Sequence, residues 1–348
     1  MEKTLLILGE YAEDDLNKNI KRLQRYAGEL KIPIKTISYE QLFYKNKIKI
    51  NTNNLLVMFF FPFKFWDKNC EIPNDTSVYG TSKQSYEIFK EFWQDVKNNL
   101  EKKFLDKNIS YIINPDYAAL DRDKIKIHDL LQKFGAETTI TLPKSLEVIL
   151  SISKNEGVFI KSRYGALGKG ITYLSRKGWF TNYKVGKKNN IENYLDIREW
   201  KFCDITGNKD FLKNLLNLEV IIEKEIKSPN LNPGKKFDLR VYSLYGESPH
   251  MFIRENYEEN IITNFSQGGK VNHKYKEILS EKTINLAKEQ ALKASKCLNS
   301  NFLGVDIIFD KNLNTPKILE VQTFTGFPQI KYCNLSKLLA NKIKERHK

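Results

Sequence analysis

The chain has 348 residues, of which 41% are hydrophobic, and its 57 basic side chains outnumber 42 acidic ones to give a formal net charge of +15. This length and apolar content exclude a largely disordered chain and predict a globular protein of two or three units. The basic residues are dispersed over the whole sequence, which favours small anionic ligands as much as nucleic acid. Four distant cysteines without a C-x-x-C pair exclude zinc-ribbon and thioredoxin-like sites.

No targeting or membrane segment is recognisable. The first residues run directly into the strand-like sequence Leu5-Leu6-Ile7-Leu8, without a basic segment or a small-residue cleavage site. The most apolar stretch, residues 55–66, is interrupted by Pro62 and Lys64 and is too short to cross a bilayer. We therefore expect a soluble cytoplasmic protein with reduced thiols and no membrane partner.

Residues 1–113 are predicted to form a small doubly wound α/β domain. Hydrophobic periodicity indicates strands at residues 4–8, 34–37 and 55–61 and helices at residues 16–30 and 82–104. Tyr86, Phe89 and Trp93 recur at helical spacing in the second helix, which favours core packing. Only Gly9 follows the first strand, so the G-x-G-x-x-G pattern of a dinucleotide site is not supported.

Residues 114–222 are predicted to form a central unit around a glycine-rich loop. A strand at residues 111–113 leads into a helix at residues 122–134 closed by Gly135, and strands follow at residues 158–162 and 171–174. Gly165, Gly168 and Gly170 lie between these two strands, so the backbone there can approach a ligand closely. Residues 182–217 are polar and irregular, and we assign them no chemistry.

Residues 223–348 are predicted to form a C-terminal unit. A strand at residues 218–222 ends the central unit, and strands at residues 237–245, 250–255, 304–309 and 317–324 follow, with a helix at residues 281–298. Helices and strands thus alternate early and segregate later, which places the chain in the α/β (α+β) class.

The last two predicted strands carry a candidate metal site. Glu320 and Gln322 share one face of their strand because residues two apart do. Asp306 lies in the preceding strand within an apolar run. Two acids and an amide on adjacent strands suit Mg²⁺ that also binds phosphate oxygens, although salt bridges to lysines would explain the same acids.

Lys161 ends the strand before the glycine-rich loop, where its ammonium could meet phosphate oxygens while loop N–H groups cradle them. A Walker A loop is excluded because its spacing needs glycine where Arg163 stands, and the H-R-D and D-F-G motifs of protein kinases are missing. An ordinary glycine-rich hairpin remains an alternative.

The order of several short motifs resembles that of ATP-grasp ligases, particularly the branch of ribosomal-protein glutamate ligases and bacterial glutathione synthetases. The resemblance covers about residues 114–328 and implies an ATP-grasp fold behind an N-terminal pre-ATP-grasp domain. Its motifs are, in chain order, Arg122-Asp123-Lys124, Val158-Phe159-Ile160-Lys161, Ile221-Ile222-Glu223-Lys224-Glu225-Ile226, Asp238-Leu239-Arg240, Phe252-Ile253-Arg254, Thr263-Asn264-Phe265-Ser266-Gln267-Gly268-Gly269, Gly304-Val305-Asp306 and Leu319-Glu320-Val321-Gln322.

The resemblance also implies roles. Lys124 and Lys161 would contact ATP phosphates with the glycine-rich loop, and Glu223, Lys224, Glu225 and Ile226 would form the hinge strand along the adenine. Arg254 would face the transferring phosphate, Arg240 would suit an anionic substrate group or a phosphate, Asp238 would belong to the ATP-binding residues, and Asn264 would lie near the metal. Asp306, Glu320 and Gln322 would hold magnesium, with two ions expected and Mn²⁺ as an alternative. Surface ion pairs are the competing interpretation of the two arginines.

Two features depart from the family pattern. Gln322 stands where relatives have asparagine, which offers the same carbonyl oxygen on a longer arm, while Mg²⁺ tolerates poor geometry badly. The turn at residues 323–328 replaces a run of small residues. The substrate side of the site is therefore expected to be unusual.

The expected activity is an ATP-dependent carboxylate–amine ligase that forms an acyl phosphate and then an amide, with small-molecule or peptide substrates. A kinase of ATP-grasp type acting on an inositol-phosphate-like hydroxyl remains an alternative, since the basic composition suits such a substrate. A nucleic-acid-binding protein is a second alternative, but no recognition helix, RNP-like strand or zinc module is present, so no nucleic-acid partner is expected. The sequence leaves a homo-oligomer open.

Overall fold

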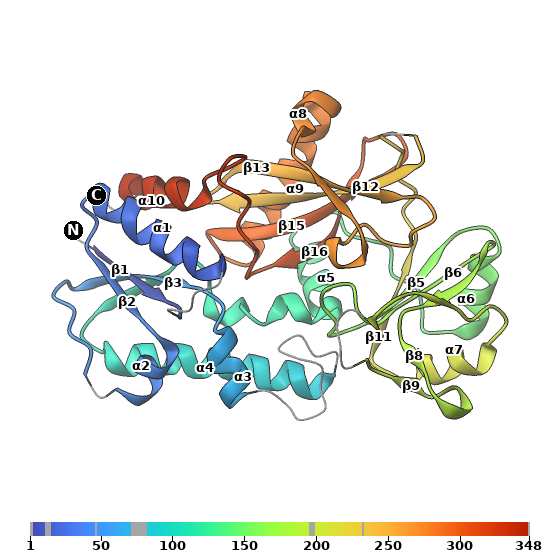
Figure 1. Ribbon diagram of the computed structural model, residues 1–348, viewed down its shortest axis with the longest axis horizontal. Coiled ribbons are helices and arrows are strands. Elements are labelled where there is room, and N and C mark those ends of the chain that lie inside the picture. The colour runs from blue at the N-terminus through green and yellow to red at the C-terminus, as the bar shows by residue number, and fades with distance from the viewer. Residues whose placement is uncertain are drawn as a thin grey trace.

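The computed structural model describes residues 3–10, 15–45, 47–70, 82–194, 199–231 and 233–346. These residues form three sheets of four or five strands and one short two-stranded ribbon. Figure 1 shows the N-terminal sheet at the left, the central sheet at the right and the third sheet above and between them. The chain thus has the mixed helix and strand content that its periodicity predicts.

The N-terminal sheet is parallel, with the strand order β2-β1-β3-β4. Helix α1 lies on one face and α2 and α4 lie on the other, as in a doubly wound domain (Figure 1). The elements are β1 (Lys3–Leu8), α1 (Asp15–Glu29), β2 (Ile34–Ile37), α2 (Tyr39–Tyr44), β3 (Asn54–Phe59), α3 (Phe63–Asn69), α4 (Lys83–Lys103) and β4 (Asn108–Tyr111).

Helix α4 confirms the prediction for residues 82–104. The Ser82 side chain accepts a hydrogen bond from the Ser85 amide at the start of the helix. Tyr86, Phe89 and Trp93 are buried against the sheet, which confirms that their spacing marks a core-facing stripe.

The central sheet is antiparallel, with the order β10-β7-β6-β5-β11. Its elements are α6 (Leu146–Ser153), β5 (Val158–Ser162), β6 (Ile171–Ser175), β7 (Gly178–Thr181), β8 (Lys184–Val185), β9 (Ile191–Glu192), β10 (Cys203–Asp204), α7 (Lys209–Leu216) and β11 (Val220–Lys224). The segment 182–217 is therefore more regular than predicted, because its described part contains α7. The Asn208 side chain caps α7, and Phe211 and Leu215 are fully buried.

The third sheet is antiparallel, with the order β14-β13-β12-β15-β16. Helix α9 covers one face, where Val241, Val305 and Val321 belong to a shared apolar core, and the opposite face carries charged residues. The elements are β12 (Lys235–Leu244), β13 (Glu247–Tyr257), β14 (Lys270–Asn272), α8 (Tyr275–Ile278), α9 (Glu281–Cys297), β15 (Phe302–Phe309) and β16 (Pro316–Gln322).

Two helices pack away from the units in which the predicted boundaries place them. Helix α5 (Lys124–Lys133) contributes Ile127 and Leu131 to the core of the third sheet. Helix α10 (Leu335–Arg346) packs against α1 at the left of Figure 1, and Leu339 joins the N-terminal core. We therefore propose that α5 belongs with the third sheet and α10 with the N-terminal unit.

Several boundaries differ from the sequence-based expectation. The helix expected from residue 122 begins at Lys124, because the Asp123 side chain caps it by accepting from the Lys126 amide. The strand expected at residues 111–113 is β4, which ends at Tyr111, and the last strand ends at Gln322 instead of residue 324.

The four cysteines are free thiols. Within the described part of the chain, no helix combines the length and the apolar character needed to span a bilayer.

Candidate active site

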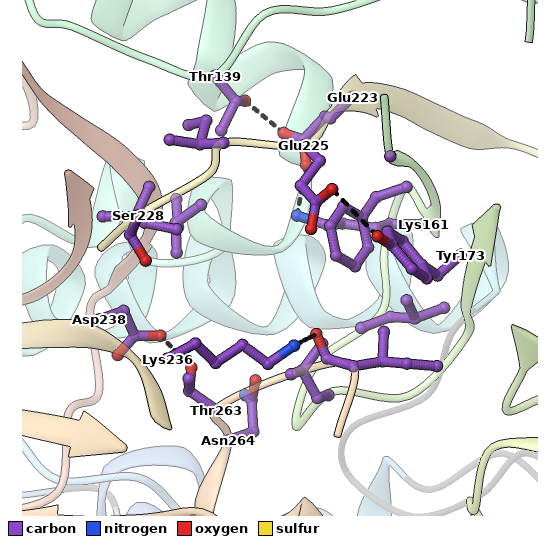
Figure 2. A pocket seen from close by; sticks show the side chains of 18 of the residues that line it. Thr139, Lys161, Tyr173, Glu223, Glu225, Ser228, Lys236, Asp238, Thr263 and Asn264 are labelled. Carbon is purple, nitrogen blue, oxygen red and sulfur yellow. Dashed lines mark hydrogen bonds and ion pairs between the residues drawn. The ribbon is translucent and has the colours of Figure 1, made fainter. Parts of the chain in front are cut away.

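A cavity of about 760 Å³ lies between the central sheet and the charged face of the third sheet. Strands β5, β6 and β11 line one side, and β12, β13, β15 and β16 line the other. Figure 2 shows Glu223, Glu225, Lys161 and Tyr173 on one wall, facing Lys236 and its neighbours on the other. The cavity therefore brings together segments that are far apart in the sequence.

Lys161 and Glu223 form an ion pair on the central sheet's wall of the cavity. Strands β5 and β11 pair in a register that places Phe159 opposite Glu223, so Lys161 emerges on the same face as that carboxylate. The Thr139 hydroxyl donates to Glu223 at 2.5 Å. Burial opposes ionisation of Glu223, but Lys161 and Thr139 outweigh it and hold the carboxyl pKa below its ordinary value.

The end of β11 and the segment that follows it continue along the cavity wall with Lys224, Glu225 and Ile226. They are held by the Lys224 amide, which donates to the Ile140 carbonyl at 2.9 Å, and by the Glu225 amide, which donates to the Gly157 carbonyl at 2.8 Å. The Glu225 carboxylate accepts from the Tyr173 hydroxyl at 3.0 Å. The predicted hinge residues thus form a continuous and anchored edge of the cavity.

The glycine-rich loop contributes Gly165 and Gly168 to the cavity lining, whereas Gly170 lies behind it. Gly168 has φ +71°, which favours glycine, and its carbonyl accepts from the Asn182 side chain at 2.6 Å. At Gly170, with φ +68°, a Cβ would lie 2.9 Å from the Ser162 Cβ. The third glycine therefore shapes the base of the loop.

Lys124 joins the loop to the third sheet. Its ammonium donates to the Gly165 carbonyl and lies 3.7 Å from a carboxylate oxygen of Glu320. Burial lowers the pKa of Lys124, and the nearby Lys161 charge adds to this effect against the attraction of Glu320. An anionic ligand would stabilise the charged form of this partly buried ammonium.

A buried chain of alternating charges crosses the inner face of the third sheet. The Arg254 guanidinium donates from Nε and Nη2 to the two carboxylate oxygens of Asp238, at 2.6 and 2.8 Å, and its Nη1 lies 2.9 Å from Asp306 Oδ2. Arg240 donates from Nε and Nη2 to Asp306 and from Nη1 to the Thr325 hydroxyl at 3.2 Å. All four charged side chains are buried, so each charge depends on its neighbours.

This network fixes the ionisation of its members. Burial alone would raise the pKa of Asp306, but Arg240 and Arg254 outweigh it and hold that pKa below its usual value. Burial likewise opposes the charge of Arg254, and Asp238 and Asp306 outweigh it to raise the pKa of the guanidinium. Arg254, Asp238 and Asp306 line the cavity, whereas Arg240 lies behind them.

Asp306 and Glu320 are direct cross-strand partners, and both line the cavity. No group of three His, Cys, Asp or Glu side chains suited to a metal occurs in the described ranges. Mg²⁺ in nucleotide sites commonly takes one or two carboxylates together with phosphate oxygens, so these two carboxylates fit such an ion. Asn264 also lines the cavity, whereas Gln322, opposite Gly304, does not.

The structure also brings residues into the site for which the sequence predicts no individual role. Thr139 contacts Glu223, Tyr173 contacts Glu225, and Thr263 donates to Asp238 Oδ2, as Figure 2 shows. The Lys236 ammonium reaches across to the Ile261 carbonyl at 3.0 Å. Thr263 belongs to the motif at residues 263–269, which could have suggested it. Thr139, Tyr173 and Lys236 are single residues without a diagnostic spacing, so only their place near a predicted motif could have suggested them.

The sequence model of the YheC/D-like ATP-grasp family matches residues 110–323, more than half of the chain. The chain belongs to this family. The match confirms the predicted ATP-grasp fold and the predicted place of the chain among the ATP-grasp enzymes. The narrower placement of this ATP-grasp protein beside glutamate ligases and glutathione synthetases stays a prediction. No curated protein matches its sequence significantly.

Solved structures of low sequence identity share the fold of this ATP-grasp chain. D-cycloserine synthetase DcsG is 12% identical with a TM-score of 0.56, over 99% of this chain and 100% of its own. The ATP-grasp ligase PsnB, solved with a minimal precursor, Mg and ADP, is 10% identical with a TM-score of 0.57, over 99% and 97%. D-alanine–D-alanine ligase from Bacillus anthracis, complexed with ATP, is 16% identical with a TM-score of 0.51 over the full length of both chains.

Proposed function

We propose that this protein joins a carboxylate to an amine through an acyl phosphate, with ADP and phosphate as the other products. The observation that supports this best is the geometry of Arg254. Its guanidinium is fixed by Asp238 and Asp306 at the cavity wall, close to the acidic pair Asp306 and Glu320. A fixed cation next to metal-binding carboxylates suits phosphoryl transfer, which depends on positioning and charge neutralisation.

ATP would lie along the length of the cavity. Glu223, Lys224, Glu225 and Ile226 would follow the adenine, as the predicted hinge. Lys161, Lys124 and the loop at Gly165 and Gly168 would contact the phosphates, since the two lysines and these glycines line the same cavity. The third sheet would receive the terminal phosphate.

Asp306 and Glu320 would hold Mg²⁺ together with phosphate oxygens. When bound, this ion would neutralise negative charge on the phosphates of ATP. Gln322 lies outside the cavity lining, so a direct role for its amide oxygen requires a movement of the strand end, whereas Asn264 already lines the cavity. The number of ions and the use of Mn²⁺ remain part of the proposal.

The reaction would proceed in two balanced steps. An oxygen of the substrate carboxylate attacks the γ-phosphorus of ATP, the bond to the β,γ-bridging oxygen breaks, and ADP leaves. The amine nitrogen then attacks the acyl carbon, the C–O bond to the phosphoryl group breaks, phosphate leaves, and the amine loses a proton to solvent. Arg254 would offset the charge on the transferring group, and Arg240 would hold Asp306 in place from behind.

The acceptor is proposed to be an amino acid or a peptide carboxylate. Structural neighbours point this way, because PsnB was solved with a precursor, macrocyclase MdnC from Microcystis aeruginosa MRC with the precursor peptide MdnA, and D-alanine–D-alanine ligase acts on an amino acid. The turn at residues 323–328 differs from the small-residue turn of relatives, so the preferred acceptor is expected to differ from theirs.

The direct test incubates the protein with ATP, Mg²⁺ and pools of amino acids or short peptides, and follows ADP release and the mass of new products. A ligase gives ADP only when both a carboxylate and an amine are present, and the product mass equals their sum minus one water. A product heavier by one phosphoryl group would identify a kinase acting on a hydroxyl instead. Glu320→Gln is the matched control, because it keeps the side-chain size and removes the charge.

A further inference from the structure

The loop between β13 and β14, residues 258–269, is anchored to the charged face of the third sheet. The Lys236 ammonium donates to the Ile261 carbonyl at 3.0 Å, and the Asn256 side chain donates to the Ile262 carbonyl at 2.8 Å. The Thr263 hydroxyl donates to Asp238 Oδ2. Three successive positions of this loop are therefore tied to β12 and β13.

The same loop contacts the glycine-rich loop of the central unit. A Cβ at Gly168 would lie 3.0 Å from Ile262 Cδ1 and 3.5 Å from Asn264 Cγ. The Gln267 side chain donates to the carbonyl of the buried Trp200 at 2.8 Å. Loop 258–269 thus bridges the two units beside the cavity, and its docked position depends on where the glycine-rich loop lies.

Thr263 connects loop 258–269 to Arg254 through Asp238. Asp238 Oδ2 accepts from the Thr263 hydroxyl and also from Arg254 Nη2, at 2.8 Å. Thr263 is 8% exposed, so its hydroxyl has little access to water as a substitute partner. Loss of that hydroxyl would free the loop from the carboxylate and leave Asp238 held by Arg254 alone within this network.

We propose that Thr263 is a positioning residue that couples docking of the glycine-rich loop to the orientation of Arg254. This proposal rests on the proposed function, since Arg254 matters only if a phosphoryl group is transferred next to it. When loop 258–269 is undocked, Thr263 withdraws from Asp238. The bidentate Asp238–Arg254 ion pair then loses the hydrogen bond that helps to hold Asp238 in place. In the docked loop, the arginine is fixed before the reaction begins, so a closed cavity and a correctly oriented cation arise together.

The competing explanation is that Thr263 only satisfies a buried carboxylate and stabilises the fold. The two explanations differ in what a substitution changes. A structural role affects the thermal midpoint and leaves the rate of folded enzyme unchanged, whereas a positioning role lowers kcat with little effect on nucleotide affinity.

The test compares Thr263→Val, which keeps the shape and removes the hydroxyl, with Thr263→Ser, which keeps the hydroxyl. Thr283→Val is the matched control, since Thr283 is also buried, at 3% exposure, but lies on α9, on the far face of the sheet. We expect Thr263→Val to lower kcat for ADP release by about tenfold or more, because small misplacements of catalytic groups cost up to about 100-fold. The KM for ATP should stay near that of the wild type, and Thr263→Ser and Thr283→Val should keep their kcat.

A second readout needs no turnover. Hydrogen exchange of residues 262–268 is measured with Mg²⁺ and a non-hydrolysable ATP analogue bound. Wild type and Thr263→Ser should be protected there, and Thr263→Val should exchange faster at equal nucleotide occupancy. If no acceptor supports ADP release by the wild type, the ligase proposal fails, and the exchange measurement still decides on the coupling.

Three results would overturn the proposal. The first is a Thr263→Val variant whose kcat and protection from hydrogen exchange equal those of the wild type. The second is a rise in KM for ATP without a fall in kcat, which would place Thr263 in nucleotide binding. The third is an equal loss in Thr263→Val and Thr263→Ser, since the serine hydroxyl can still donate to Asp238.

Discussion

Replacing Asp306 by asparagine removes the carboxylate that two buried arginines share. In the native protein Asp238, Arg254, Asp306 and Arg240 alternate in charge and sum to zero. In the Asp306→Asn variant, Arg254 keeps Asp238, but Arg240 loses the carboxylate among the partners described for it and keeps the Thr325 hydroxyl. The substitution therefore strands a positive charge in a buried position without changing the shape of the side chain.

The size of the effect follows from that stranded charge. Breaking a buried ion pair by removing one partner costs about 3–5 kcal/mol of unfolding free energy, and the amide oxygen of asparagine can still accept one bond, so we expect the lower end. Arg240→Met should cost a similar amount, since it leaves Asp306 with Arg254 alone. The double variant restores neutrality, so its loss should be smaller than the sum of the single losses by about 2 kcal/mol.

Equilibrium urea unfolding, followed by far-UV circular dichroism, measures these differences. The dependence on pH gives an internal check, because the pKa of Asp306 is held below its usual value by Arg240 and Arg254 against the effect of burial. The carboxylate therefore stabilises the protein above its unfolded pKa of about 3.9 and loses this effect as pH falls through the folded pKa. The difference in unfolding free energy between wild type and Asp306→Asn should become smaller as the pH falls through the folded pKa of Asp306. This account of the network would be refuted if the losses of unfolding free energy in the two single variants simply added up in the double variant. It would also be refuted if the difference between wild type and Asp306→Asn did not change with pH.

Three further predictions concern the cavity and its surroundings. Lys161→Met and Glu320→Gln should each lower ADP release about 100-fold or more with an unchanged circular dichroism spectrum, and full activity in either variant would remove that residue from the site. Phe324→Ala should lower the unfolding free energy by about 2–3 kcal/mol, because the ring stacks on Trp93 at 4.6 Å but is only partly buried; an unchanged thermal midpoint would contradict this. Burial lowers the pKa of Lys124, so kcat/KM for ATP should decline at high pH in the wild type before it does in Lys124→Arg, and identical pH profiles would argue against this ammonium as a phosphate ligand.

The residues that could be predicted from the sequence are those on regular strands. A period of two places Glu320 and Gln322 on one face of their strand, with Asp306 on the adjacent strand, and the register of β15 with β16 makes Asp306 and Glu320 direct partners. Lys161 is predicted next to the glycine-rich loop because it lies at the end of the preceding strand, which is β5 in the structure. Strand periodicity fixes the face of a side chain, and that was enough to bring these charges together.

Strand periodicity does not predict how deeply a side chain lies within the site. Arg240 and Arg254 share a face, but Thr325 packs over Gly304 and accepts from Arg240, which places this arginine behind the cavity lining. Thr263 reaches Asp238 from a loop, and loops carry no period from which a contact could be derived. The short helix α7 was missed because its apolar stripe covers only two turns among asparagines and lysines.

The packing of α10 has a consequence for the order of folding. Leu339 and Ile343 fill a core whose other members begin at β1, so the first sheet along this sequence is completed by the last helix that the structure describes. During translation, part of the apolar surface of the N-terminal unit therefore stays uncovered while the central and third sheets are synthesised. A ribosome stalled before residue 335 would therefore hold a chain whose central and third sheets can form while its N-terminal core stays incomplete and exposed to chaperones.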